Sequence, residues 1–300
     1  CNGGSNMKDN KTKLWKTLKI IFSIWILSFL VSSFFSFNTE FDIAGGNVAI
    51  IPITDIILTS SGGFNNPATS SETVISFLDQ AQNNPNIKAI LLDINSPGGS
   101  GVAADEIGQK IKEINKPTIA VIREMGASAA YWIASSSDYI FANRLSLTAS
   151  IGVIGSYLDF SELIEEYNVS YQRYVSGELK DMISPFKEDT PKEERLFQEI
   201  IDQSHEFFIM EVAQNRNMSK EEIRKLADGR IMLGSQAFEA GLVDELGTKQ
   251  DAIKYIESSL NITAVTVEYK EKVSITELLY GFTSSKGGKF INSNIPIQFK

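Results

Sequence analysis

The sequence predicts an α/β protein in which parallel strands alternate with helices, preceded by one long apolar segment. Three observations lead to this class. Short apolar runs recur along the chain, amphipathic stretches of helical periodicity separate them, and an uncharged run lies near the N-terminus. With 300 residues, 43% of them hydrophobic, the chain can build one sizeable core with extensions. Its net charge of −9 argues against a nucleic-acid partner, because nucleic-acid-binding surfaces are normally basic.

The apolar segment covers residues 20–37, IIFSIWILSFLVSSFFSF, and at ~1.5 Å per residue it nearly spans a ~30 Å hydrocarbon layer. Lysines are frequent in the preceding residues 1–19, whereas the first charge after the segment is Glu40. This bias predicts a single-pass cell-membrane anchor with a cytoplasmic N-terminus and an extracytoplasmic body. A cleaved signal peptide and a buried core helix are the competing interpretations. The sequence after the run shows no small-x-small cleavage pattern, which favours the uncleaved anchor.

A polar linker is expected at 38–46, and the alternation of strands and helices begins after it. Strands are expected at 47–58, 87–94 and 117–122. Helices are expected at 70–84, 100–115 and 127–137. Repeated βαβ units of this kind form a parallel sheet with right-handed crossovers. The body is expected to span 47–262, followed by a C-terminal extension, 263–300, without assigned structure.

Two of the expected strand ends carry unusual loops. In DINSPGGSG (93–101), Gly98 and Gly99 can leave peptide N–H groups free for an anion, although an ordinary turn also explains them. In GASAAYW, Ser128 stands at the start of a helix, where a simple N-cap is the competing interpretation. Strand ends of one sheet edge lie together. They can therefore supply Ser128 Oγ as a nucleophile and the N–H groups of Gly98 or Gly99 and of Ala129 as an oxyanion hole.

A serine nucleophile needs a base, and the chain has one histidine. His205 lies in a charged amphipathic stretch, 191–216, which begins with a capping box at Thr190 and Glu193. A surface or helix-packing role is the simpler interpretation of this histidine. A lysine can replace it where burial keeps the amine neutral, and the candidate is Lys180. With a single cysteine in the chain, no multi-cysteine metal site is expected, and the chemistry requires neither metal nor cofactor.

Four stretches of the chain carry a family resemblance. They are LLDINSPGGSGVAADEI, GASAAYWIASSSDYIFANRLSLTASIGVIG, SGELKDMISPFKEDTPKEERLFQEIIDQSHEFF and DGRIMLGSQAFEAGLVDELGTKQDAI. In order and spacing they resemble the signal peptide peptidase A family of Ser/Lys proteases, over roughly residues 47–256. The resemblance implies a ClpP/crotonase-like fold of repeated ββα/βαβ units. It also implies that Ser128 is the nucleophile, that Lys180 is the general base and that Ser150 helps to orient the lysine.

For the oxyanion hole, the resemblance implies the N–H groups of Gly98 or Gly99 and of Ala129. The chain departs from the family at one point. Many members carry Ser-Gly-Gly after the nucleophile, whereas Ser128 is followed here by Ala129 and Ala130. The peptide N–H survives this change, so the donor is retained. The change affects the conformational freedom of the backbone after Ser128 and the space available to a substrate residue.

The resemblance further implies a membrane-anchored serine endopeptidase that degrades remnant signal peptides and other short apolar peptides. It implies a homo-oligomer whose sites draw on neighbouring chains. Two alternatives come from other functional classes. One is a catalytically silent membrane scaffold of the same fold, and the other is a crotonase-type acyl-CoA enzyme with the same oxyanion hole. The presence of both Ser128 and Lys180 favours the protease over the scaffold, and the expected extracytoplasmic location disfavours an enzyme that depends on CoA.

Overall fold

The computed structural model describes residues 5–37, 45–60 and 68–270. It divides into two units, Cys1–Gly45 and Gly46–Lys300. The described part of the first unit is essentially one helix, α1 (Ser5–Phe37), whose large apolar side chains between Trp15 and Leu30 are 40–67% exposed.

The expected anchor at 20–37 lies within α1. In the described part of the chain, no helix is both long enough and apolar enough to cross a membrane, so the structure does not confirm this expectation. The side chains of residue 31 and of residues 33–37 lie outside the described part. Most of the expected linker, residues 38–44, also lies outside it, as do residues 271–300 of the expected C-terminal extension.

The second unit is an α/β body built on a mainly parallel sheet, as the sequence predicts. Its strands are β1 (Val48–Leu58), β2 (Ala68–Ser70), β3 (Ala89–Gly99), β4 (Thr118–Ala127), β5 (Tyr139–Ala142), β6 (Leu147–Ala149), β7 (Ile231–Leu233), β8 (Glu245–Leu246) and β9 (Thr266–Glu268). Its helices are α2 (Ser71–Asn83), α3 (Gly101–Lys112), α4 (Ala129–Ser135), α5 (Ser161–Glu166), α6 (Pro191–Asn215), α7 (Lys220–Leu226), α8 (Gly234–Glu239) and α9 (Lys249–Leu260).

The strands and helices expected between residues 47 and 137 are confirmed, but two strands are longer than expected. β3 ends at residue 99 rather than 94, and β4 ends at residue 127 rather than 122. The extra residues stay extended because they still pair, Ser96 with Gly126 and Gly99 with Ile57. The glycine pair therefore belongs to a strand end. The next helix, α3, begins only after its N-cap, Ser100.

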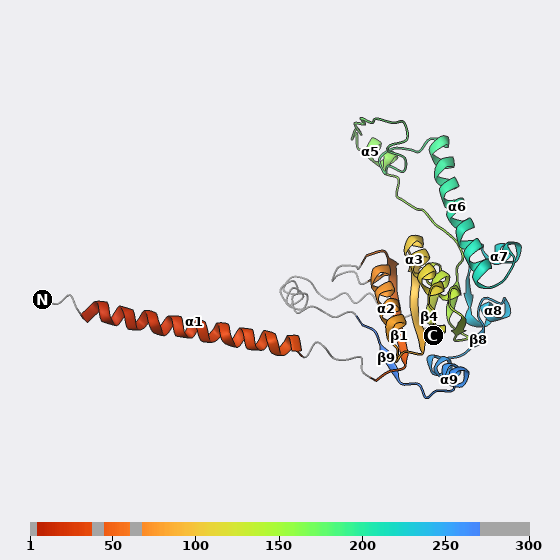
Figure 1. Ribbon diagram of the computed structural model, residues 1–300. Coiled ribbons are helices and arrows are strands. Elements are labelled where there is room, and N and C mark those ends of the chain that lie inside the picture. The colour runs from red at the N-terminus through yellow and green to blue at the C-terminus, as the bar shows by residue number, and fades with distance from the viewer. Residues whose placement is uncertain (1–4, 38–44, 61–67, 271–300) are drawn as a thin grey trace, which may run out of the picture. The chain divides into compact units, whose positions relative to one another are not determined.

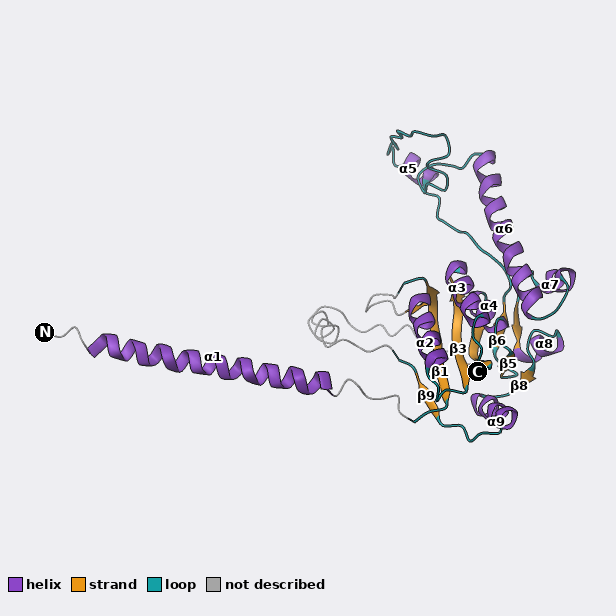
Figure 2. Cartoon of the chain, in the orientation of Figure 1, coloured by secondary structure: helices purple, strands orange, loops and turns teal. Residues whose placement is uncertain are grey.

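The main sheet has the strand order β2-β1-β3-β4-β5-β8, and these neighbours are all parallel (Figure 1). β9 adds in parallel to β1, and β6 joins β4 to the antiparallel β7. Helices cover both faces of the sheet (Figure 2), and strands buried in this way are apolar throughout rather than alternating. Ile51 and Leu92 pack with α2, α3 and α4, whereas Ile50 and Leu91 pack with α9.

The long helix α6 is anchored to the body by its C-terminal half. Phe208 stacks on Trp132 of α4 with ring centroids 4.9 Å apart, and Asn215 donates to the hydroxyls of Ser135 and Ser136 at 3.0 and 3.1 Å. The N-terminal half continues beyond the sheet. It carries residues 153–190, called the arm here, which include α5 (Figure 1). No residue of the arm is buried.

Replacing Arg216 by Met tests the anchor at the end of α6. Arg216 donates to the Asp244 carboxylate at 2.6 and 2.9 Å and to the Gly241 carbonyl at 3.1 and 3.2 Å, and its side chain is 9% exposed. The Asp244 carboxylate then keeps the hydrogen bond from the Ile140 N–H at 2.8 Å but loses its cationic partner. This loss is expected to lower the free energy of unfolding by about 2 kcal/mol in urea titrations. Arg224→Met breaks an exposed pair with Glu206 and is the matched control, with an expected loss under about 1 kcal/mol. Equal losses of unfolding free energy in the two variants would contradict the role of Arg216 as an anchor of α6.

Candidate active site

Ser128 occupies the tight turn between β4 and α4. Its backbone lies at φ 54° and ψ −124°, a conformation that residues other than glycine adopt only when their surroundings impose it. Its N–H donates to the Ala149 carbonyl at 2.8 Å, and its carbonyl accepts from the Trp132 N–H at 3.0 Å. The side chain makes no capping hydrogen bond, so the N-cap interpretation of Ser128 is wrong. The turn instead presents a half-buried hydroxyl that the helix does not use.

The end of β3 lies directly against this turn. A Cβ atom on Gly98 would lie 2.8 Å from the Ala127 carbonyl oxygen, 2.9 Å from Ser128 Cβ and 3.0 Å from the Ala129 nitrogen. The φ of Gly98 is also +108°, so both space and backbone conformation require glycine there. The strand ends that the sequence predicts to be adjacent are therefore in contact.

The two glycines of this strand end make different contacts. The Gly98 N–H donates to the Ser96 hydroxyl at 3.1 Å. Gly99 pairs with Ile57 of β1, and the Ser100 N–H donates to the Ile57 carbonyl at 2.8 Å. The pairing of Gly99 and Ser100 with Ile57 holds this strand end on β1.

Ser150 lies one residue beyond the carbonyl that holds Ser128. Ala149 and Ser150 both have positive φ, 61° and 52°. The Ser150 N–H donates to the Arg230 carbonyl at 3.0 Å, and its hydroxyl donates to the Gly229 carbonyl at 3.3 Å. The structure thus places Ser150 beside the Ser128 turn, together with Gly98, Gly99 and Ala129.

Lys180 is the predicted site residue that the fold of one chain does not bring to this turn. It is exposed and lies in the arm, where its N–H donates to the Gly177 carbonyl at 3.2 Å. The arm joins the N-terminus of α6 at Pro191, and at ~1.5 Å per residue this end lies roughly 25 Å from Phe208, which packs against α4. Figure 1 shows the arm at the far end of α6 from the sheet. The base candidate and the serine therefore stand apart within one chain.

His205 takes a packing position, in line with the simpler interpretation of it. It lies on α6 three residues before Phe208 and is partly buried, and its Nε2 is enclosed without a hydrogen-bond partner among the described residues. Across the residues that the structure describes, no three side chains of His, Cys, Asp or Glu are arranged to hold a metal ion. The turn at Ser128 places a hydroxyl-bearing side chain close to the Ala129 nitrogen and to the glycine end of β3.

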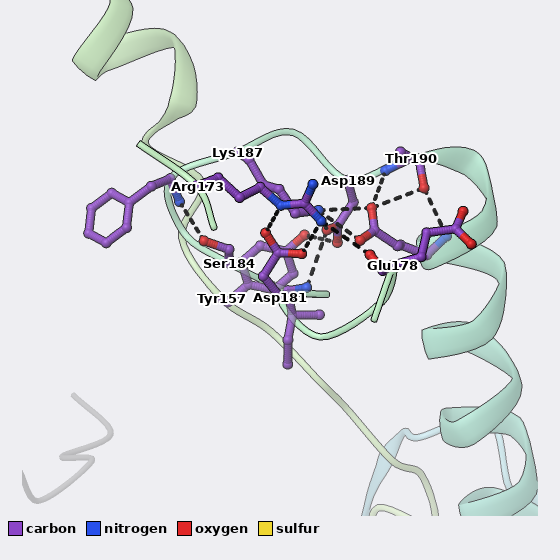
Figure 3. A network of polar contacts seen from close by, with 11 residues as sticks. Tyr157, Arg173, Glu178, Asp181, Ser184, Lys187, Asp189 and Thr190 are labelled. Carbon is purple, nitrogen blue, oxygen red and sulfur yellow. Dashed lines mark hydrogen bonds and ion pairs between the residues drawn. The ribbon is translucent and has the colours of Figure 1, made fainter. Parts of the chain in front are cut away.

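A polar network joins the arm to the start of α6 (Figure 3). Lys187 Nζ contacts both carboxylate oxygens of Glu193 at 2.8 Å, and the N–H and hydroxyl of Thr190 each donate to this carboxylate at 2.9 Å. The hydrogen bond from Lys187, followed by that from the Thr190 backbone, lowers the pKa of Glu193 to about 2. The expected Thr190 and Glu193 capping box is confirmed. The role of Lys187 could not be predicted from the sequence, because the capping box is a local pattern of residue types whereas the loop that brings Lys187 to Glu193 is not.

Comparison with known proteins gives two family matches. The model of peptidase family S49 matches residues 110–263, and the Clp protease model matches residues 56–156. An Enterococcus faecium protein named "Putative signal peptide peptidase SppA" is 37% identical over 226 residues, which cover 74% of this chain and 64% of that protein. A Methanocaldococcus jannaschii protein named as a protease is 33% identical, with 71% of each chain covered. Protease 4 of Haemophilus influenzae is 32% identical, and the match covers 35% of its length. The chain thus spans less than two thirds of the first and about a third of the last.

Replacing Glu193 by Gln is expected to loosen the arm in a pH-dependent way. The folded-state pKa of about 2 lies below the ordinary 4.5, so the ionised carboxylate stabilises the folded arm above pH 4.5, and this contribution disappears as the pH falls toward 2. Hydrogen-exchange protection factors for residues 187–196 are expected to be lower in the variant than in the wild type at pH 6. The two proteins are expected to converge near pH 2.5. A difference that stays constant from pH 6 to pH 2.5 would contradict the role of this carboxylate.

Proposed function

Because the chain belongs to peptidase family S49, we propose that it is a serine endopeptidase with Ser128 as nucleophile and Lys180 as general base. The observation that carries the proposal is the strained turn at Ser128. It leaves the hydroxyl outside the helix and next to the Ala129 N–H and the glycine end of β3. A nucleophile on a sharp turn from strand to helix, beside backbone donors, is an arrangement suited to acyl transfer.

In the proposed oxyanion hole, the donors are the N–H groups of Gly99 and Ala129. Gly99 is preferred to Gly98 because the Gly98 N–H already donates to the Ser96 hydroxyl. The developing negative charge on the carbonyl oxygen of the substrate would be held between two backbone dipoles. Alanine at position 129 serves as well as glycine in this respect, since only its peptide N–H takes part.

The proposed reaction has two halves. Lys180 Nζ removes the proton of Ser128 as the serine oxygen bonds to the peptide carbonyl carbon, and the carbonyl π electrons move to the oxyanion. The intermediate collapses, the C–N bond breaks, and the lysine returns the proton to the leaving amine. Water then attacks the acyl-serine, again giving its proton to the lysine, and the Ser128 oxygen leaves and is reprotonated. Ser150, beside the turn, is proposed to orient the lysine.

The base is proposed to come from a neighbouring copy of the chain. Lys180 is exposed, and the arm that carries it has no buried residue and stands at the far end of α6 from Ser128 of the same chain. Large apolar side chains of this arm face solvent in the single chain, among them Ile154 (86% exposed), Leu158 (70%) and Tyr174 (92%). Exposed large apolar side chains this frequent in one segment are typical of a surface that another chain covers. Burial of Lys180 against a neighbour would favour the neutral amine that a general base requires.

The proposed substrates are remnant signal peptides and other short apolar peptides, and the proposed location is the cell membrane with the body outside the cytoplasm. Support for the substrates comes from the name of the Enterococcus relative, which the chain matches over 64% of that protein. Support for the location comes from the uncharged run at 20–37, the lysines before it and the exposed apolar side chains of α1. Peptides released from a bilayer would meet an active site held close to it.

Ser128→Ala and Lys180→Ala are each expected to lower kcat on a peptide substrate by at least ~10⁴-fold, because nucleophile and base act as one unit. His205→Ala is the matched control and is expected to stay within a few-fold of the wild type, provided that its melting temperature shows a folded protein. A fluorophosphonate probe should label the wild type but not the Ser128→Ala variant. A folded Lys180→Ala enzyme with wild-type kcat would refute the dyad.

Mixing the two inactive variants separates a base from the same chain from one supplied by a neighbour. In oligomers assembled from equal amounts of Ser128→Ala and Lys180→Ala chains, an intact Ser128 meets an intact Lys180 of its neighbour at about one quarter of the sites. Co-expressed chains should therefore regain about a quarter of wild-type kcat. If activity stays absent in oligomers shown to contain both chains, the pairing between chains is refuted.

Membrane attachment is expected to depend on the apolar run. The full chain should stay with the membrane after a carbonate wash, and protease added to spheroplasts should digest the body. Ile24→Lys together with Leu27→Lys should release the chain, since each buried charge costs about 3 kcal/mol at the centre of a span. Lys13→Gln is the control and should remain bound. A body protected until detergent is added would mean that the topology is inverted.

A further inference from the structure

We propose that Arg173 is a positioning residue that holds the Lys180 loop and withdraws the neighbouring Asp181 carboxylate from the lysine; this inference rests on the proposed function. Arg173 Nη2 donates to Asp181 Oδ1 at 2.7 Å, and its Nε donates to the other oxygen of that carboxylate. The same Nη2 donates to the Glu178 carbonyl at 3.1 Å. One guanidinium thus holds the chain on both sides of Lys180 (Figure 3).

The loop between these two contacts is a short run of turns. The N–H groups of Lys180 and Met182 donate to the carbonyls of Gly177 and Leu179, at 3.2 and 3.3 Å. Turns with so few bonds and so little burial are weakly held by themselves. A planar donor that bridges residues 178 and 181 limits how far the base can move, and lysine cannot replace it, because an ammonium lacks the fixed fork of donors.

The charge of Asp181 gives the contact a second consequence. Asp181 directly follows Lys180, and a free carboxylate there would favour the protonated amine, which cannot act as a base. Arg173 engages both of its oxygens, and the Asp181 side chain is only 11% exposed. The hydrogen bond from Arg173 lowers the pKa of Asp181, so the pair stays ionised over the pH range in which a lysine base titrates. The guanidinium itself does not titrate in this range.

Several other charged groups near the loop are paired with one another. On the α6 side, the Glu178 carboxylate pairs with Lys192 at 2.9 Å, and Glu193 pairs with Lys187. Within the arm, Asp189 accepts from the Tyr157 hydroxyl and from Lys187, the latter at 3.5 Å. The hydrogen bond to Asp189 raises the pKa of Tyr157 to about 12. The charge of Lys187 also lowers the pKa of Asp181, but this lysine is paired with Glu193. The loss of Arg173 would therefore remove the guanidinium hydrogen bonds of Asp181 and leave its carboxylate beside Lys180.

Arg173→Met in the full chain is expected to lower kcat at least ~10-fold, with little change in KM. It is also expected to raise by about one unit the pH at which kcat/KM is half-maximal, because the released Asp181 carboxylate favours the charged lysine. Arg173→Met with Asp181→Asn should return this midpoint to the wild-type value while kcat stays low. Arg173→Lys should keep the wild-type midpoint, since it still neutralises Asp181, but should not restore kcat.

The control is Arg224→Met, which breaks the exposed pair with Glu206 and should alter neither quantity. Melting temperature and oligomer size are recorded for every variant, so a loss of assembly is seen directly. If Lys180→Ala is inactive while Arg173→Met matches the wild type in kcat and midpoint, the positioning role is overturned and the dyad stands. If Lys180→Ala is active, the proposed function itself has failed. A low kcat with an unmoved midpoint in the folded, assembled Arg173→Met variant would also overturn the role assigned to Asp181.

Discussion

The contact between the end of β3 and the turn at Ser128 is the constraint on which the candidate site depends. Gly98 can approach Ser128 and Ala129 only without a side chain, and the Ser128 backbone is held in its strained form by its bond to the Ala149 carbonyl. A strained residue persists only where its surroundings over-determine it. Here the parallel sheet provides this constraint, because β3, β4 and β6 all end at the same edge.

The long helix α6 has a different role, since it carries the proposed base away from its own serine. The aromatic stack of Phe208 on Trp132 and the pair of Arg216 with Asp244 fix one end of α6 to the body. The other end holds the arm through the network around Lys187 and Glu193. The two ends of α6 are thus attached to different parts of the molecule, so the separation of serine and lysine follows from the length and direction of this helix. In an assembly of several copies, this separation would allow Lys180 of one chain to reach Ser128 of a neighbour.

Much of the site could be predicted from residue types at strand ends. Gly98, Gly99, Ser128 and Ala129 lie together because parallel strands that alternate with helices bring such ends to one edge. The choice between the two glycines could not be predicted, because it depends on the hydrogen bond that the Gly98 N–H donates to Ser96. The contact of Arg173 with Asp181 escaped prediction for a similar reason. Eight residues apart, outside any regular element, the two side chains show no periodicity that points to a pair.

By itself, the sequence determined the order of the strands and helices between residues 47 and 137, the apolar run at 20–37 and the residue types able to carry out acyl transfer, because burial periodicity and side-chain chemistry are local properties. It also determined the capping box at Thr190, which lies within four consecutive residues. Only the tertiary structure decided that the Ser128 hydroxyl does not cap its helix, that the Gly98 N–H is already used, and that Lys180 stands far from the serine of its own chain. These facts depend on strand register and on the direction of a 25-residue helix, which no local pattern encodes.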